Sequence, residues 1–316
     1  MPEKIVLFID SVHSILEEEL QRNGFQCILN ETAEWETLAK DYPQTVGMVI
    51  RSRWVLNQEI LDAFPQLKWI ARSGSGLENI DCNHAKSKGI HVLSSPEGNA
   101  DAVGEYVIGA ALSMTRLFIP ANASVKNKQW LREEHRGVEI KNKTFGIIGL
   151  GHMGSSVAKK LTGLGCEVMA YDKYLTKSPV DHVTLVDLKT LQSKADFVSL
   201  HLPLSEETLG YANKAFFNAF EKPIYFINTA RGKHCVTSEL LDAIDQNKVL
   251  AAALDVLEFE STQLKVGNEQ HPSYQRLLTY HNVFLTPHIA GWTHESYYKL
   301  SKVLAEKILA LNPEGR

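Results

Sequence analysis

Three kinds of side chain that could bind a small carboxylic acid and transfer a proton to it follow apolar runs in the second half of the chain. Arg231 can bind a carboxylate through two parallel hydrogen bonds and polarise a neighbouring carbonyl group. His288 can donate or accept a proton near neutral pH. Either Glu258 or Glu260 could lie beside that histidine, where a carboxylate stabilises the protonated ring and fixes its tautomer. Together they indicate proton transfer at the oxygen of a 2-keto or 2-hydroxy acid, although each residue alone also suits an ordinary surface position.

A glycine-rich turn indicates a dinucleotide site. Gly149, Gly151 and Gly154 form G-x-G-x-x-G between an apolar run and a helical pattern. Asp172 ends the next apolar run, 18 residues after the last glycine, where an acidic residue accepts hydrogen bonds from the adenosine ribose. A carboxylate there repels the 2′-phosphate of NADP, so the pattern favours NAD, while the neighbouring Lys173 weakens that preference. The alternative is a strand-to-helix turn without a ligand.

Two series of apolar runs must position these residues. Continuous apolar runs separated by amphipathic segments indicate parallel strands covered by helices on both faces. The first series has five predicted strands: Lys4–Asp10, Phe25–Leu29, Val46–Ile50, Lys68–Ala71 and Ile90–Leu93. The second has six: Thr144–Gly149, Cys166–Asp172, Ala195–Leu202, Ile224–Asn228, Leu250–Val256 and Asn282–Thr286. The sequence therefore predicts two α/β units, the second with a doubly wound sheet.

Turn-forming residues place the boundaries between the two units. Ser94–Asn99 is rich in turn formers, and Asn99 is the expected N-cap of a long apolar helix, Asp101–Phe118. A last helix is expected after Gly291, with Thr293 as its N-cap and an apolar face that packs on the first unit. The predicted domains are residues 1–98 with 291–316, and residues 99–290.

Composition excludes several classes of protein. Lys and Arg number 33 and Asp and Glu 37, a formal net charge of −4, which gives no general attraction to nucleic acid. The four cysteines form no C-x-x-C pair, so neither a zinc site nor a disulfide framework is expected. The opening MPEKIVLFID holds too short an apolar run for a signal peptide. A cytoplasmic protein without metal, membrane or nucleic-acid partners is expected.

The motifs together resemble those of the NAD-dependent D-isomer-specific 2-hydroxyacid dehydrogenases over nearly the whole chain. The matching segments are RSGSGLENID (72–81), GNADAVGEY (98–106), GLGHMG (149–154), HLPLSEETLG (201–210), INTARG (227–232), LDV (254–256) and LTPHIAG (285–291). The resemblance implies a flavodoxin-like α/β substrate domain interrupted by a Rossmann-type cofactor domain with a doubly wound parallel sheet.

The resemblance also implies residue roles. Arg231 would orient the substrate, His288 would be the catalytic acid and base, and Glu260 its carboxylate partner. The loop Ser73, Gly74, Ser75 and Gly76 would bind the substrate carboxylate through backbone N–H groups, and Asp255 would contact the nicotinamide amide. The implied NAD contacts are Gly149, Gly151, His152, Met153, Gly154, Asp172, Leu202, Pro203, Thr208, Thr229, Ala230, Arg231, Asp255 and His288.

Two departures from the family pattern matter. Ser261 follows Glu260 where the family usually has proline, which leaves Glu258 as an alternative partner of the histidine. After Arg231 and Gly232 the chain has His234-Cys235-Val236, where the family usually has an apolar pair and then Asp or Asn.

Within the family the chain most resembles the phosphoglycerate dehydrogenases of serine biosynthesis, in a short form without a C-terminal regulatory domain. The cations that would bind the substrate phosphate are Arg51, Arg53, Arg72 and Arg132, unless these are solvated surface arginines. The long apolar helix and the resemblance predict a homodimer joined through the cofactor domains. Two alternatives stay open: a reductase of glyoxylate, hydroxypyruvate or another 2-keto acid, and a non-enzymatic NAD-sensing corepressor.

Overall fold

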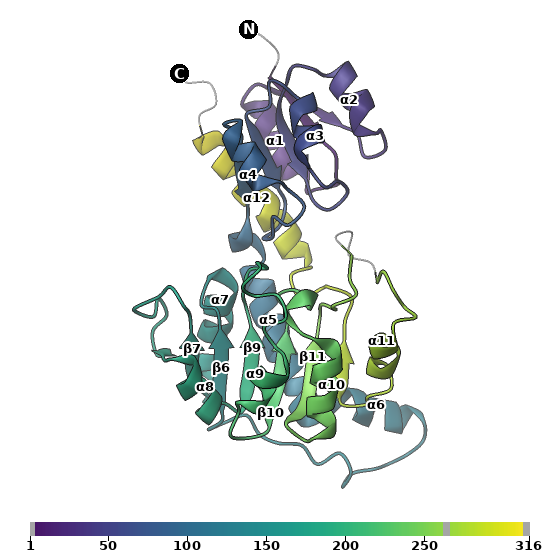
Figure 1. Ribbon diagram of the computed structural model, residues 1–316, viewed down its shortest axis with the longest axis vertical. Helices are drawn as coiled ribbons and strands as arrows, with labels where there is room; N and C mark the ends of the chain where they lie inside the picture. Colours follow the sequence, from purple (N-terminus) through teal and green to yellow (C-terminus); the bar gives the residue numbers. More distant parts are fainter. Residues whose placement is uncertain (1–3, 262–265, 312–316) are drawn as a thin grey trace. The chain divides into compact units, whose positions relative to one another are not determined.

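The computed structural model describes residues 4–261 and 266–311 of the chain. These residues form two compact units, which divide between Asn99 and Ala100 and again between Gly291 and Trp292 (Figure 1). The first three and last five residues, where the predicted first domain begins and ends, lie outside the described residues. Each unit holds a parallel sheet between helices, so the predicted α/β fold class is confirmed.

The first unit is built on a five-stranded sheet of order β2-β1-β3-β4-β5. Its strands are β1 Lys4–Phe8, β2 Phe25–Leu29, β3 Thr45–Ile50, β4 Trp69–Arg72 and β5 His91–Ser94, and its helices include α1 Ile15–Arg22, α2 Trp35–Asp41, α3 Gln58–Ala63 and α4 Cys82–Ser87. Successive residues of β1 enter different cores: Ile5 and Leu7 one, Val6 and Phe8 the other. This alternation explains the continuous apolar runs, because both faces of the sheet are covered.

The last helix, α12 (His294–Ala310), packs on α1 within this unit. It begins as predicted at Thr293, whose hydroxyl accepts a hydrogen bond from the Ser296 N–H at 3.0 Å, while the Ser296 hydroxyl accepts one from the Thr293 N–H. This reciprocal cap satisfies two N–H groups that a helix start leaves unpaired. Leu304 and Ile308 bury their side chains in the same core as α1.

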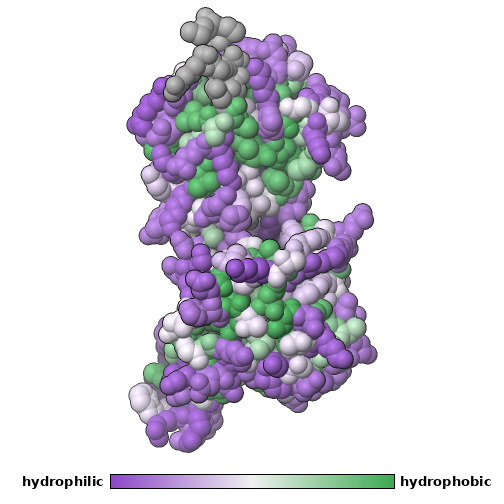
Figure 2. Space-filling view, turned by 90° about the vertical axis from the view of Figure 1, so that its left-hand side faces the viewer, coloured by the Kyte–Doolittle hydropathy of each residue, from purple (hydrophilic) through white to green (hydrophobic). Residues whose placement is uncertain are grey.

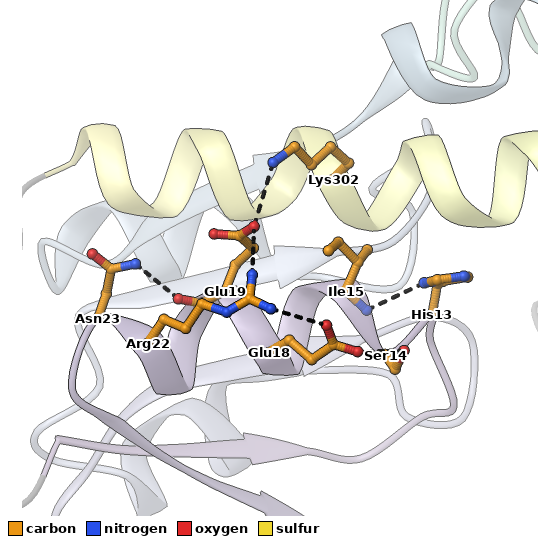
Figure 3. A network of polar contacts seen from close by, with 8 residues as sticks. All are labelled: His13, Ser14, Ile15, Glu18, Glu19, Arg22, Asn23 and Lys302. Carbon is orange, nitrogen blue, oxygen red and sulfur yellow. Dashed lines mark hydrogen bonds and ion pairs between the residues drawn. The ribbon is translucent and has the colours of Figure 1, made fainter.

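An ion pair crosses from α12 to α1 at the edge of that apolar contact. Figure 3 shows Glu19 of α1 between Arg22 of the same helix and Lys302 of α12. The glutamate Oε1 lies 3.2 Å from the arginine Nη1 and 3.5 Å from the lysine Nζ. The sequence-distant C-terminal helix is thus tied to the first unit by apolar packing and by charge.

The second unit contains a seven-stranded parallel sheet of order β12-β11-β10-β9-β6-β7-β8. Its strands are β6 Thr144–Ile148, β7 Glu167–Tyr171, β8 Thr184–Leu185, β9 Phe197–Leu200, β10 Ile224–Asn228, β11 Val249–Leu254 and β12 Val283–Leu285. Six of them were predicted. The edge strand β8 was missed because two residues are too few to show a periodic pattern. The strand order reverses between β6 and β9, where open α/β sheets bind ligands beyond the carboxyl ends of their strands.

The helices of the second unit follow the strands in the α/β manner. They are α7 His152–Leu161, α8 Leu188–Lys194, α9 Lys214–Asn218, α10 Thr237–Asp245 and α11 Pro272–Leu277, with short 3-10 turns at η1 Thr162–Leu164 and η2 Gly232–His234. Two buried clusters, one on each face of the sheet, form the core. On the face drawn in Figure 2, hydrophilic side chains surround smaller apolar areas.

The long apolar helix differs from its prediction at both ends. α5 runs from Pro96 to Arg116, so Asn99 lies inside the helix and is not its N-cap. Proline suits the first position of a helix, where its missing N–H is not needed. Gly98 brings the backbone close to α12, since a Cβ there would lie 2.6 Å from the Leu300 nitrogen. The helix ends early because Leu117 adopts φ 53°, and α6 (Phe118–Lys126) follows.

No single helix among the described residues is long and apolar enough to cross a membrane. α5 and α6 meet the length and composition criteria only as a pair bent by 59°.

Candidate active site

The glycine turn lies between β6 and α7, at the reversal of strand order. Gly149 has φ +90°, and a Cβ there would meet the His201 carbonyl oxygen at 2.6 Å. A Cβ on Gly154 would lie 2.0 Å from the Gly149 carbonyl oxygen, so side chains are excluded at both positions. At Gly151, by contrast, a Cβ would meet nothing within 4 Å. The middle glycine therefore presents bare backbone to open space at the start of α7, where unpaired N–H groups favour phosphate.

The carboxylate of Asp172 is held against this turn. Its Oδ2 accepts a hydrogen bond from the Leu150 N–H at 2.9 Å, and its Oδ1 accepts one from the Tyr174 N–H at 2.9 Å. The neighbouring Lys173 turns to Glu207, with 2.5 Å between Nζ and Oε1. Lys173, whose charge weakens the expected preference for NAD, is thereby paired with the carboxylate of Glu207.

The next strand of the sheet brings a neutral histidine behind the glycine turn. His201 follows β9, and its N–H donates to the Ile148 carbonyl oxygen at 2.8 Å. Its Nε2 lies 2.8 Å from the Ser199 hydroxyl oxygen. Burial lowers the pKa of His201 to about 3, because desolvation disfavours the charged ring. The ring is therefore uncharged at neutral pH.

Further residues expected to line the cofactor lie on the two loops beyond β9 and β10. The Thr208 hydroxyl donates to the Pro203 carbonyl oxygen at 2.7 Å and so stabilises its own turn. Leu202 packs beside the first glycine, where a Cβ on Gly149 would lie 3.2 Å from its side chain. The Thr229 hydroxyl is buried and has no hydrogen-bond partner among the described residues. The open glycine, the fixed carboxylate and this unpaired hydroxyl fit a dinucleotide.

Glu260 and His288 meet beyond the carboxyl ends of β11 and β12. The His288 Nδ1 and the Glu260 Oε1 are 2.5 Å apart, with both side chains mostly buried. Glu258 instead accepts a hydrogen bond from the Thr237 N–H at 2.9 Å, at the start of α10. Of the two glutamates left open by the sequence, Glu260 is the one the structure brings to the histidine.

The turn that carries His288 is held by Asp255. His288 has φ +57°, and its N–H donates to the Asp255 carbonyl oxygen at 2.8 Å. The Asp255 carboxylate accepts from the N–H groups of Ile289 at 2.8 Å and Ala290 at 2.7 Å. Asp255 is 1% exposed. The resemblance implied a nicotinamide contact for this residue, and the structure shows its carboxylate bonded to N–H groups of the histidine turn.

Arg231 is the N-cap of η2, just beyond β10. Its carbonyl oxygen accepts from the Asn228 side-chain amide at 3.0 Å, and its N–H donates to the His234 Nδ1 at 3.2 Å. The buried His234 also reaches the Pro203 carbonyl oxygen through Nε2, at 3.2 Å. No role is predicted for His234 from the sequence, although it departs from the family pattern at this position. A Cβ on Gly232 would lie 1.9 Å from the Leu257 carbonyl oxygen, so the arginine turn adjoins the loop of Glu260.

Arg231, Glu260 and His288 therefore follow three neighbouring strands, β10, β11 and β12, at one edge of the sheet. Parallel strands place their carboxyl ends side by side, which is why residues far apart in sequence converge there. Among the described residues, no group of three or more His, Cys, Asp or Glu side chains is arranged to hold a metal ion.

Two predicted phosphate-binding arginines have structural contacts within the first unit. The Arg53 guanidinium donates to the carbonyl oxygens of Ala33 at 2.5 Å and Asn30 at 3.2 Å, and it lies over the Trp54 ring. The Arg51 guanidinium lies 4.4 Å from the centroid of the Trp292 ring and donates to the Ser11 carbonyl oxygen at 3.3 Å. Burial lowers the pKa of Arg51. The N–H groups of Arg53 used in this way are not available to a phosphate.

The remaining predicted substrate residues lie in different settings. Gly74 has φ +149°, and a Cβ there would overlap the Arg72 guanidinium, so that side chain folds over its own loop. Ser73 is buried and its hydroxyl has no partner among the described residues, while Ser75 and Gly76 are half-buried. Arg132 belongs to the second unit and is 86% exposed, 3.5 Å from a carboxylate oxygen of Glu133.

Comparison with known proteins places these features in a family. Residues 108–290 match the family model for the D-isomer specific 2-hydroxyacid dehydrogenase, NAD binding domain. The chain is 34% identical over 306 residues to D-3-phosphoglycerate dehydrogenase of Archaeoglobus fulgidus, covering 96% of this chain and 56% of that protein. It is 36% identical over 283 residues to hydroxypyruvate reductase of Thermotoga maritima, covering 89% of each. This chain thus spans about half the length of the archaeal relative and most of the bacterial one.

The fold has close counterparts among solved structures. A glyoxylate reductase from Paecilomyes thermophila superposes with a TM-score of 0.87, covering 100% of this chain and 97% of that one at 22% identity. At that identity the likeness concerns the fold alone.

Proposed function

The chain belongs to the D-isomer specific 2-hydroxyacid dehydrogenase family, whose NAD-binding domain forms most of its second unit, and we propose that it interconverts a D-2-hydroxy acid and a 2-keto acid. The observation that carries this proposal is the 2.5 Å contact between His288 and Glu260 at the edge that also bears Arg231. A cation and a carboxylate-paired histidine are what a 2-keto acid requires.

Each residue has a defined part in the proposed reaction. Nicotinamide supplies the hydride when NAD(H) is bound. Arg231 holds the substrate carboxylate and polarises the carbonyl group. With Nδ1 of His288 bonded to Glu260, Nε2 of the ring gives its proton to the carbonyl oxygen in reduction and takes it back in oxidation. Glu260 stabilises the protonated ring between these two events.

The proposed cofactor is NAD in preference to NADP. Asp172 faces the glycine turn with its carboxylate fixed by two backbone N–H groups, in position for the ribose hydroxyls. Thr229 adds, on the neighbouring loop, a buried hydroxyl that no described residue pairs with.

For the substrate we propose first the pair 3-phosphoglycerate and 3-phosphohydroxypyruvate, because the chain resembles phosphoglycerate dehydrogenases and carries Arg51, Arg72 and Arg132, three of the four cations expected to bind the phosphate. A second candidate is the reduction of hydroxypyruvate or glyoxylate. The structural contacts of Arg53 favour it, since they remove one of the four expected phosphate ligands.

The test is NADH oxidation by the purified protein with 3-phosphohydroxypyruvate, hydroxypyruvate, glyoxylate, pyruvate and 2-ketoglutarate. The proposed reaction predicts turnover that falls by about 10²–10⁴-fold in His288→Gln, the usual contribution of a general acid. Tight NADH binding without turnover of any acid would instead indicate a cofactor-sensing protein. Arg132→Ala separates the substrates, because it should impair the phosphorylated acid selectively.

We also propose a homodimer formed through the second unit. α6 and the segment after it expose large apolar side chains: Phe118, Ile119, Val125, Trp130 and Leu131. Trp130 is 83% exposed, which is unusual for so large an apolar surface without a partner. Light scattering should give twice the chain mass of 35.4 kDa at micromolar concentration, and a monomer would contradict the proposal.

A further inference from the structure

A relay of hydrogen-bonded hydroxyl groups on partly buried side chains runs from α5 to the histidine turn. The Tyr106 hydroxyl oxygen, from the middle of α5, lies 2.5 Å from the Thr286 hydroxyl oxygen. The Thr286 hydroxyl in turn lies 2.5 Å from Oδ1 of Asp255. All three residues belong to the second unit, so this series of hydrogen bonds lies within one compact body.

The geometry fixes the direction of these hydrogen bonds. The Thr286 hydroxyl donates its single proton to Oδ1 of Asp255. The threonine oxygen can then only accept from Tyr106, whose phenol must therefore keep its proton. Burial raises the pKa of Tyr106 to about 12, so the phenol is protonated throughout the neutral range.

The carboxylate at the end of this chain determines the shape of the turn. Its two oxygens accept from the N–H groups of Ile289 and Ala290, the two residues after His288. His288 itself has φ +57°, a conformation that costs a non-glycine residue energy and persists only where its surroundings impose it. The orientation of the Asp255 carboxylate is thus part of what holds the His288 ring toward Glu260.

We infer that Tyr106 is a positioning residue for His288: its hydroxyl orients Thr286, which orients the Asp255 carboxylate that holds the histidine turn. Tyr106 acts at a distance and does not touch the reacting atoms. This inference rests on the proposed function only in giving His288 the role of acid and base. The positioning itself is a property of the protein without substrate.

The test compares Tyr106→Phe with a matched control, Tyr211→Phe. Both substitutions remove one phenol oxygen from the second unit, but the Tyr211 hydroxyl has no hydrogen-bond partner among the described residues. Thr286→Val, which breaks the same chain one step nearer the carboxylate, provides a second variant.

Two readouts are needed. In NADH oxidation with the best 2-keto acid, Tyr106→Phe should lower kcat by about tenfold, or about 1.4 kcal/mol of barrier, with KM and the Kd for NADH within twofold of wild type. In NMR of the protein without substrate, the imidazole resonances of His288, assigned with His288→Gln, should shift in Tyr106→Phe and in Thr286→Val but not in Tyr211→Phe.

The two readouts fail separately. If the wild type turns over no acid but the His288 resonances respond as expected, the proposed reaction is wrong and the positioning inference stands. Unchanged His288 resonances in both Tyr106→Phe and Thr286→Val would overturn the inference. So would a fall in kcat that Tyr211→Phe reproduces.

Discussion

The neutral histidine behind the glycine turn gives the protein a stability that depends on pH. His201 has a pKa of about 3 in the folded protein, because its ring is desolvated. In the unfolded chain its pKa returns to about 6.5. Between these two values the unfolded chain binds a proton that the folded protein does not, so the free energy of unfolding falls as the pH falls below about 6.5.

The size of the effect follows from the two pKa values. Each pH unit in this window changes the free energy of unfolding by about 1.36 kcal/mol for one group. Lowering the pH to 4.5, two units below the unfolded pKa, should therefore remove about 2.7 kcal/mol of stability through this ring alone. The loss continues until the pH approaches the folded value and then stops.

The assay is urea unfolding of the wild type and of His201→Gln at pH 7.5 and pH 4.5. Glutamine keeps a polar group near the Ser199 hydroxyl but does not titrate. The other eleven histidines and all the carboxylates are present in both proteins, so the difference between the two pH dependences isolates this ring. The variant should lose about 2–3 kcal/mol less than the wild type between the two pH values. Equal losses within about 0.5 kcal/mol would refute the reasoning, since they would show that the folded protein admits the proton freely.

Three further substitutions test the site. Glu260→Gln should lower kcat for 2-keto acid reduction by about 10- to 100-fold, because it removes one charge-assisted hydrogen bond to His288. The matched variant Glu258→Gln should keep kcat within twofold of wild type. Steady-state kinetics that rank the two variants the other way would reverse the assignment. Gly154→Ala should weaken NADH binding at least about tenfold in a fluorescence titration, because the new Cβ would lie 2.0 Å from the Gly149 carbonyl oxygen. Unchanged affinity would show that the backbone of the turn moves to make room for a methyl group without loss of binding. Glu207→Gln should release Lys173 and raise the kcat/KM ratio of NADPH to NADH by about threefold in buffer of low salt; an unchanged ratio would mean that this exposed pair has no part in cofactor choice.

Local sequence patterns were enough for most of the architecture. Strands buried on both faces are largely apolar, so Ile224–Asn228 was predicted with its observed bounds. The edge strand Phe25–Leu29 was also predicted with its observed bounds, from a shorter apolar pattern. The glycine turn was also predicted from the sequence, because the close approach of backbone atoms at Gly149 and Gly154 leaves no room for a side chain. The Thr293 cap was also predicted, since its hydrogen bonds join residues three apart.

Features set by packing between distant segments were beyond such patterns. The spacing of Glu258 and Glu260 could not distinguish them, because the choice depends on where α10 and the histidine turn lie around one loop. The sequence predicts Arg53 as a phosphate ligand, but its guanidinium donates to backbone carbonyl groups 20 and 23 residues away. The early end of α5 at Leu117 had no sequence signal either, since leucine ordinarily continues a helix.

The sequence by itself determined which residue types stand at the ends of the strands, because strand periodicity and glycine spacing are local properties of the chain. The tertiary structure alone decided which of those residues meet. Glu260 and His288 meet, and Arg231 follows the adjacent strand, because β10, β11 and β12 are neighbours and parallel, so that their carboxyl ends share one edge. The desolvation of the His201 ring and the burial of Asp255 were decided in the same way, because desolvation depends on every segment that packs around a side chain.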